Sequence, residues 1–170
     1  VLQRHMRHVE TGEPLPDALI DRIRAALHFN QGFDNVEYVA CALVDQAIHQ
    51  ADPATLDPVA FEAGQLAKIG MPSTIRMRHR LPHFGHLFSG DGYSARYYVY
   101  LWAAVLEADG FAAFVETGNV FDPATAQRLY RHIYSVGDSV EPGGTYRAFR
   151  GRDPAVAALL KARGLDGTPA

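Results

Sequence analysis

The sequence predicts an all-α fold, a single multi-helix domain with one Gly-rich loop. Apolar residues recur at helical spacing along most of the chain, and Asp-Pro steps alternate with glycines as start and stop signals for helices. Length points the same way, because 170 residues can enclose one hydrophobic core but are too few for two comfortable domains.

The first two expected helices lie on either side of a break at Asn30-Gln31-Gly32. Helical spacing places an apolar face on each, formed in the first by Leu19, Ile20, Ile23 and Leu27 and in the second by Val36, Val39, Ala40, Leu43 and Ala47. Asp34 and Glu37 form a predicted capping pair at the start of the second helix.

Asp-Pro steps mark the later helix starts. Aspartate accepts hydrogen bonds at helix N-caps, and proline suits the first helical position because its missing N–H would be unpaired there. The four steps begin at Asp52, Asp57, Asp122 and Asp153. The last three precede helical patterns that stop near Gly70, Gly137 and Gly164, which suit C-caps.

Residues 71–92 depart from the helical pattern. Met71 to Arg80 is mixed, which indicates an extended segment or a short strand, and the loop Ser89-Gly90-Asp91-Gly92 follows. The longest helical run extends from about Tyr93 to Glu116 and is ended by Gly118.

Composition excludes several classes of protein. The net charge is -3 and no block of Lys or Arg occurs, so a nucleic-acid partner is not expected. No apolar stretch is long enough to span a bilayer, so no membrane partner is expected either. The one cysteine, Cys41, cannot form an intramolecular disulfide, and nothing requires an oxidising compartment.

Several motifs that carry chemistry are missing from the chain. It has no His-Glu-x-x-His, no paired Cys motif, no Gly-x-Ser-x-Gly and no phosphate-binding loop. His83 and His86 are spaced as a local pair, but zinc requires three or four ligands and no carboxylate or Cys obviously completes the set. No metal ligand is therefore expected here, and a stand-alone site at these two histidines is kept as an alternative.

Tyrosines form the strongest candidate site. Tyr93, Tyr97 and Tyr100 stand at i, i+4 and i+7, so on one continuous helix they would fall within roughly 60° of arc. Neutral phenols, with His86 nearby, can donate hydrogen bonds to an oxyanion that develops on a carbonyl under attack. The helix would pack through a neighbouring face that holds Tyr98, Leu101 and Val105.

A structural interpretation of the same residues stays open at this point. Tyrosines at helical spacing are often half-buried core residues, a single histidine such as His86 is often structural, and a Gly-rich loop is often a plain connector. The pattern alone indicates a suspected binding cleft.

The segment Pro82–Trp102, which reads PHFGHLFSGDGYSARYYVYLW, resembles the thimet oligopeptidase and bacterial peptidyl-dipeptidase family of zinc metallopeptidases, the latter most of all. Segments 11–16, 29–33, 149–152 and 163–165 resemble other parts of the same family. The resemblance implies that residues 1–165 are the C-terminal helical portion of a zincin-like catalytic domain, and that residues 166–170 are an unrelated tail.

The resemblance also implies an activity and a missing part. The family hydrolyses short peptides in a channel, with Zn²⁺ held by a His-Glu-x-x-His helix and a further Glu, and with the motif Glu as general base. All of these residues are expected upstream of Val1, and a start without an initiator Met is typical of a fragment. The implied partners are short peptides and that upstream zinc-bearing part. A cytoplasmic location is implied, and the chain alone is expected to be inactive.

Site roles carry over residue by residue. By the resemblance, His86 and Tyr100 hydrogen-bond the tetrahedral intermediate, and Tyr93 and Tyr97 contact substrate near the scissile bond. Gly90 and Gly92 would belong to the substrate-binding loop, where the family usually has glycine in place of Asp91. The alternative function is a non-catalytic helical module that binds peptides or serves as structure.

Overall fold

The computed structural model describes residues 2–167. Those residues form helices joined by turns, and the pairing of extended backbone among them is limited to one bridge between Arg7 and Pro14. The predicted all-α fold is thus confirmed. The elements are α1 (Leu2–His5), α2 (Asp17–Leu27), α3 (Gln31–Ile48), α4 (Pro58–Lys68), the 3-10 turns η1 (Leu81–His83) and η2 (Gly85–Phe88), α5 (Val99–Val115), α6 (Pro123–Leu129), the π-helical turn η3 (Tyr130–Tyr134), α7 (Pro142–Arg150) and α8 (Ala157–Ala162).

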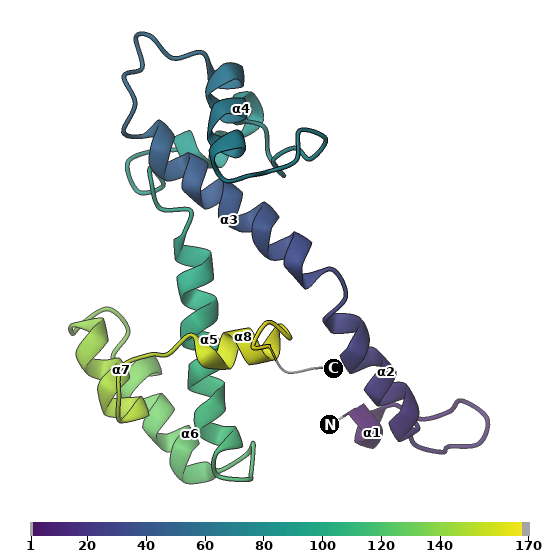
Figure 1. The fold of residues 1–170 in the computed structure, drawn as a ribbon. Helices are drawn as coiled ribbons and strands as arrows, with labels where there is room; N and C mark the ends of the chain where they lie inside the picture. Colours follow the sequence, from purple (N-terminus) through teal and green to yellow (C-terminus); the bar gives the residue numbers. More distant parts are fainter. Residues whose placement is uncertain (1, 168–170) are drawn as a thin grey trace.

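The helices from α3 onward form two packed groups connected by α5, whereas α1 and α2 lie apart from both groups (Figure 1). At one end α3 packs against α4, which also contacts η1. At the other end η3 continues α6 and packs against α7, and α8 packs across α5. α8 also reaches back toward the joint between α2 and α3, where Arg163 donates to the side-chain carbonyl of Asn35.

Two of the predicted Asp-Pro starts carry the expected caps. The Asp57 carboxylate accepts from the Ala60 N–H at 2.7 Å, and the Asp122 carboxylate accepts from the Thr125 N–H at 2.7 Å. A helix follows Asp153 and stops near Gly164 as predicted, but the predicted cap at Asp153 was wrong, because α8 begins later, at Ala157. Asp153 instead accepts from Arg147 at 2.9 Å.

The predicted start of α3 was also wrong. The helix begins at Gln31, and Asn30 before it has left-handed backbone with φ 61° and makes no side-chain cap. Asp34 therefore lies inside the first turn. Glu37 lies further along and accepts from Arg78 at 2.8 Å, which ties α3 to the segment 71–80.

The first core lies between α3, α4 and residues 71–88. No strand forms in 71–80, so that half of the prediction was wrong, and the segment runs through turns that bury Met77. The face of α3 that is buried differs from the predicted one, because Val36 and Leu43 are 53% and 47% exposed. The core consists of Ala40, Cys41, Val44, Leu66, Met77, Leu81, Phe84 and Leu87.

A buried carboxylate on α4 fixes the turn that precedes His86. Glu62 is 1% exposed, and it accepts from the Leu81 N–H at 2.8 Å and from Arg80. Because a buried charge is tolerated only with partners, these bonds hold η1 firmly on α4.

The predicted apolar face of α2 is not covered by any described part of the chain. Leu19, Ile23 and Leu27 are 43%, 44% and 65% exposed, and α2 has no buried residue. The spacing of these residues predicted the helix correctly. Separately, no helix among residues 2–167 is both long and apolar enough to cross a bilayer.

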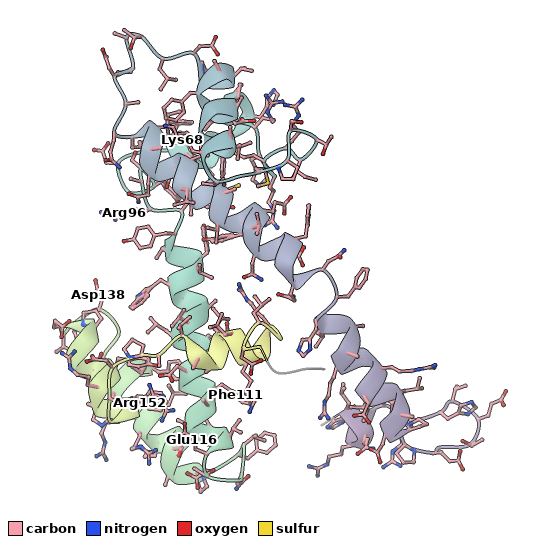
Figure 2. All side chains as sticks on the ribbon, viewed as in Figure 1. Lys68, Arg96, Phe111, Glu116, Asp138 and Arg152 are labelled. Atoms are coloured by element: carbon pink, nitrogen blue, oxygen red, sulfur yellow. The ribbon has the colours of Figure 1, made fainter. Side chains whose placement is uncertain are left out.

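The second packed group is built around Asp109 of α5, which is 1% exposed. Tyr146 donates to its Oδ2 atom at 2.7 Å, Arg152 also donates to the carboxylate, and Arg150 lies 3.4 Å away. Burial alone would raise the pKa of Asp109, but the bonds from Arg152 and Tyr146 and the nearby guanidinium charges bring it below its ordinary value. Figure 2 shows Arg152 on this side of α5, with Glu116, a second carboxylate that binds Arg150, nearby.

We expect Asp109→Asn to lower the free energy of unfolding by about 3 kcal/mol, because it removes the charge that two arginines share. The pKa of Asp109 is lower in the folded chain, so its stabilisation is complete above the ordinary value of 3.8 and is lost as pH falls through the folded-state pKa. Urea unfolding at pH 7 and at pH 3 measures both effects.

The control for Asp109→Asn is Asp138→Asn, which changes an exposed aspartate in the same group of helices (Figure 2). Equal unfolding free energies for the two variants at pH 7 would contradict the role given to Asp109.

Candidate functional site

The predicted long helix forms, but its predicted start at Tyr93 was wrong, because α5 begins only at Val99 and ends at Val115. Tyr93 and Tyr97 lie in turns, so the three tyrosines do not share one face of a single helix. The backbone departs from helical geometry at Gly90, with φ 135°, and at Ala95, with φ 56°. These left-handed residues redirect the chain before the helix can start.

The predicted site residues nevertheless meet, around the ring of His86. Ring centroids lie 4.9 Å from His86 to Tyr93 and 5.9 Å from His86 to both Tyr97 and Tyr100. The Tyr100 hydroxyl is 3.1 Å from His86 Nε2, which is a hydrogen-bonding distance. A folded loop, rather than a helix stripe, brings the four rings together.

This aromatic cluster, His86 with Tyr93, Tyr97 and Tyr100, borders an open cavity, which all of its members except Tyr97 line. Tyr93 and Tyr100 are 46% and 50% exposed, while Tyr97 is half-buried and packs against the first core. The cavity has a volume of about 430 Å³, and its lining comprises His86, Gly92, Tyr93, Arg96, Tyr98, Val99 and Tyr100. Figure 2 marks Arg96 on the segment just before α5.

The two loop glycines occupy different surroundings. Gly92 lines the cavity of the aromatic cluster, whereas Gly90 and Asp91 line a separate cavity of about 590 Å³ beside His49 and Phe88. The carbonyl of Gly90 accepts from the Tyr93 N–H at 2.9 Å, which closes the turn. Of the residues predicted to pack on the neighbouring face of this helix, Val105 is buried as expected. Tyr98 was predicted wrongly, because it is 53% exposed.

Sequence reasoning missed the residues on α3 that support the loop. Asp45 accepts from the backbone N–H groups of Ala95 and Tyr97, and Tyr38 stacks on Tyr97 with ring centroids 5.2 Å apart. The sequence feature that could have indicated these residues is the pair of polar residues Asp45 and Gln46 within an apolar stretch of α3.

Burial keeps two phenols of this region protonated. It raises the pKa of Tyr97 above 10.0, and it raises the pKa of Tyr38 in the same way. Both groups are therefore neutral across the physiological range, and their hydroxyls can act as hydrogen-bond donors.

The described residues contain no group of three or more His, Cys, Asp or Glu side chains placed to hold a metal ion. His83, on η1, is exposed, whereas His86 is half-buried among aromatic rings. The donor set in residues 2–167 does not fit zinc, which binds three or four protein ligands.

Comparison with known proteins supports the resemblance seen in the sequence. The sequence pattern of peptidase family M3 matches residues 1–165. The chain is 36% identical to the dipeptidyl carboxypeptidase of Salmonella typhimurium over 170 residues, covering 98% of this chain and 25% of that protein. It is 37% identical to oligopeptidase A of Escherichia coli over 165 residues, covering 94% of this chain and 24% of that protein.

The same similarity extends to a eukaryotic relative. The thimet-like oligopeptidase of Dictyostelium discoideum is 32% identical over 152 residues, which cover 89% of this chain and 22% of that protein. The chain thus spans about a quarter of the length of the curated relatives that it matches. With a family match along almost its whole length and identities above 30%, this chain belongs to peptidase family M3.

Proposed function

We propose that this chain forms one wall of the active site of a zinc-dependent oligopeptidase or peptidyl-dipeptidase that hydrolyses short peptides. The contact between His86 and Tyr100, 3.1 Å apart at the edge of an open cavity, is the observation that carries this proposal. The family membership and the names of the relatives, dipeptidyl carboxypeptidase and oligopeptidase A, support the same activity.

In this proposal His86 and Tyr100 stabilise negative charge on the substrate. A phenol and a neutral imidazole can each present one N–H or O–H donor without adding a charge to the site. In this structure the two groups share one hydrogen bond, which uses one of these two donors. When His86 Nε2–H donates to the Tyr100 oxygen, the Tyr100 O–H is left free to donate to the oxyanion, and both groups can donate together only after their mutual bond opens. Tyr93, which lines the cavity, would contact the bound peptide near the scissile bond. The same role is proposed for Tyr97 from the family resemblance alone, because Tyr97 packs against the first core and does not line this cavity.

Zinc would come from outside this chain. When bound in the complete protein, the metal would polarise the peptide carbonyl, and its ligands and the general base would belong to the upstream segment. In this proposal the residues described here bind the peptide and orient its carbonyl. The alternative is a helical module without catalytic function.

We also propose a cytoplasmic location for the complete protein. The Arabidopsis thaliana relative named "Probable cytosolic oligopeptidase A" supports it, with 34% identity over 165 residues. A second Arabidopsis relative is named as chloroplastic and mitochondrial, so an organelle is the alternative. Cell fractionation with an antibody to this chain distinguishes the two.

The proposed activity is tested by comparing this chain with a version extended upstream to the length of its relatives. We expect the 170 residues alone to bind little zinc and cleave no peptide, because residues 2–167 contain no complete ligand set. The extended protein should do both, as measured by metal analysis and by mass spectrometry of peptide products.

A chelator-treated sample of the extended protein is the control for this test. Hydrolysis by the 170 residues alone, or none by the extended protein after zinc is restored, would refute the proposal. Peptide binding without hydrolysis would favour the non-catalytic module.

In the extended protein, Tyr100→Phe should lower kcat by roughly 10²- to 10³-fold with little change in zinc content, because it removes one oxyanion donor. Steady-state kinetics and metal analysis measure the two quantities. Tyr130→Phe is the matched control, since Tyr130 is 58% exposed on η3 and distant in sequence from the aromatic cluster. Near-normal turnover of Tyr100→Phe would remove Tyr100 from the mechanism.

Asp91→Gly should change substrate preference more than zinc affinity. Asp91 adds an exposed carboxylate to the loop, and it should disfavour acidic substrate side chains. We expect the kcat/KM ratio of a Glu-containing peptide to its Gln counterpart to rise about two- to fivefold, the range of exposed charge interactions. An unchanged ratio, or a matching loss of zinc, would contradict this role.

A further inference from the structure

The loop that carries the aromatic cluster rests on a polar stripe of α3. Tyr38 and Asp45 stand seven residues apart, which is close to two full helical turns, so both face the same side. That side meets residues 95–101, although α3 otherwise packs through apolar residues.

Asp45 binds the backbone on both sides of Arg96. Its Oδ1 atom accepts from the Ala95 N–H at 3.2 Å, and its Oδ2 atom accepts from the Tyr97 N–H at 2.8 Å. His49 Nδ1 lies 2.9 Å from Oδ1 and provides a third partner. The carboxylate is 0% exposed, so removing these partners would leave a buried charge unpaired.

The Asp45 contacts also explain an unusual backbone angle. Ala95 has φ 56°, a left-handed conformation that is sterically unfavourable for an L-residue with a Cβ atom. Its N–H is held by Asp45 and its carbonyl accepts from the side chain of Gln46, so two neighbouring residues of α3 hold both polar groups. The strain is offset by hydrogen bonds from one helix.

Tyr38 sets the point at which α5 begins. Its hydroxyl donates to the Tyr97 carbonyl and lies 3.3 Å from the Leu101 N–H, which it can accept. Residues 97 and 101 are an i, i+4 pair, which an α-helix would join directly. The phenol thus takes the place of that direct bond between residues 97 and 101. The Leu101 N–H also donates to the Tyr98 carbonyl at 3.1 Å, so the first turn of α5 closes through an i, i+3 bond.

The backbone position of Tyr97 affects the aromatic cluster because the Tyr97 ring contacts its other members. That ring lies 5.4 Å from Tyr100 and 5.9 Å from His86, centroid to centroid. A shift of its backbone would therefore displace the neighbours of the proposed oxyanion donors. Displacements of about 1 Å at a catalytic group can cost roughly 10²-fold in rate.

We infer that Tyr38 and Asp45 are positioning residues for peptide hydrolysis, which hold Tyr97 and the first turn of α5 so that His86 and Tyr100 meet. This inference rests on the proposed function. Neither residue lines the cavity of the aromatic cluster, so neither is expected to touch substrate.

The experiment uses the zinc-loaded extended protein and its variants Tyr38→Phe and Asp45→Asn. Tyr38→Phe keeps the ring that stacks on Tyr97 but removes the inserted hydroxyl, and Asp45→Asn keeps one acceptor but replaces the other with a donor. Asp34→Asn is the control, because it makes the same chemical change at an exposed position of α3.

Steady-state kinetics, zinc content and hydrogen exchange together separate a positioning role from a general loss of structure. We expect kcat to fall roughly 10- to 10²-fold in both variants, while KM changes less than threefold and zinc content is unchanged. Hydrogen exchange of the backbone amides 95–101 should become faster in both variants. Exchange in α4 and α7 should match that of the control.

An unchanged kcat in both variants would overturn the inference. So would a loss of kcat that is accompanied by equally faster exchange in α4 and α7, because the residues would then act only through stability. If the unsubstituted extended protein cleaves no peptide, the proposed function fails. In that case unchanged exchange at 95–101 would also refute the positioning role, whereas faster exchange would show that α3 holds the loop.

Discussion

The structure around the candidate site depends on one buried carboxylate. Asp45 lies at 0% exposure and binds two backbone N–H groups of the segment that leads into α5. Desolvating this charge would be unfavourable without those partners, so the segment must stay where its N–H groups reach α3. Helix α5, which connects the two packed groups of helices, begins directly after this segment.

Buried carboxylates play a similar role elsewhere in residues 2–167. Glu62 binds the start of η1. Asp109 of α5 binds Tyr146 of α7 and Arg152, which follows α7, and so links these segments. Each links segments that apolar packing alone leaves weakly defined, since many large apolar side chains are exposed. The hydrogen bonds of these buried carboxylates define how the segments are placed, and hydrophobic packing alone does not.

The aromatic cluster shows how residues can meet in the structure although their local secondary structure was predicted wrongly. Spacing assigned Tyr93, Tyr97 and Tyr100 to one helix face, yet only Tyr100 lies in α5. The three rings still surround His86, because the loop folds back over η2. The cluster depends on contacts with α3, which is about fifty residues away in sequence, and no local pattern carries that information.

The sequence alone determined the helical class, the caps at Asp57 and Asp122, and the four residues of the aromatic cluster as candidates, because helical period, capping chemistry and a long shared motif are local properties of the chain. Only the tertiary structure decided where α3 and α5 begin, which face of α3 is buried, and how His86 meets Tyr100. Those outcomes follow from hydrogen bonds made by buried Asp45 and half-buried Tyr38, whose partners are specified only when distant segments pack together.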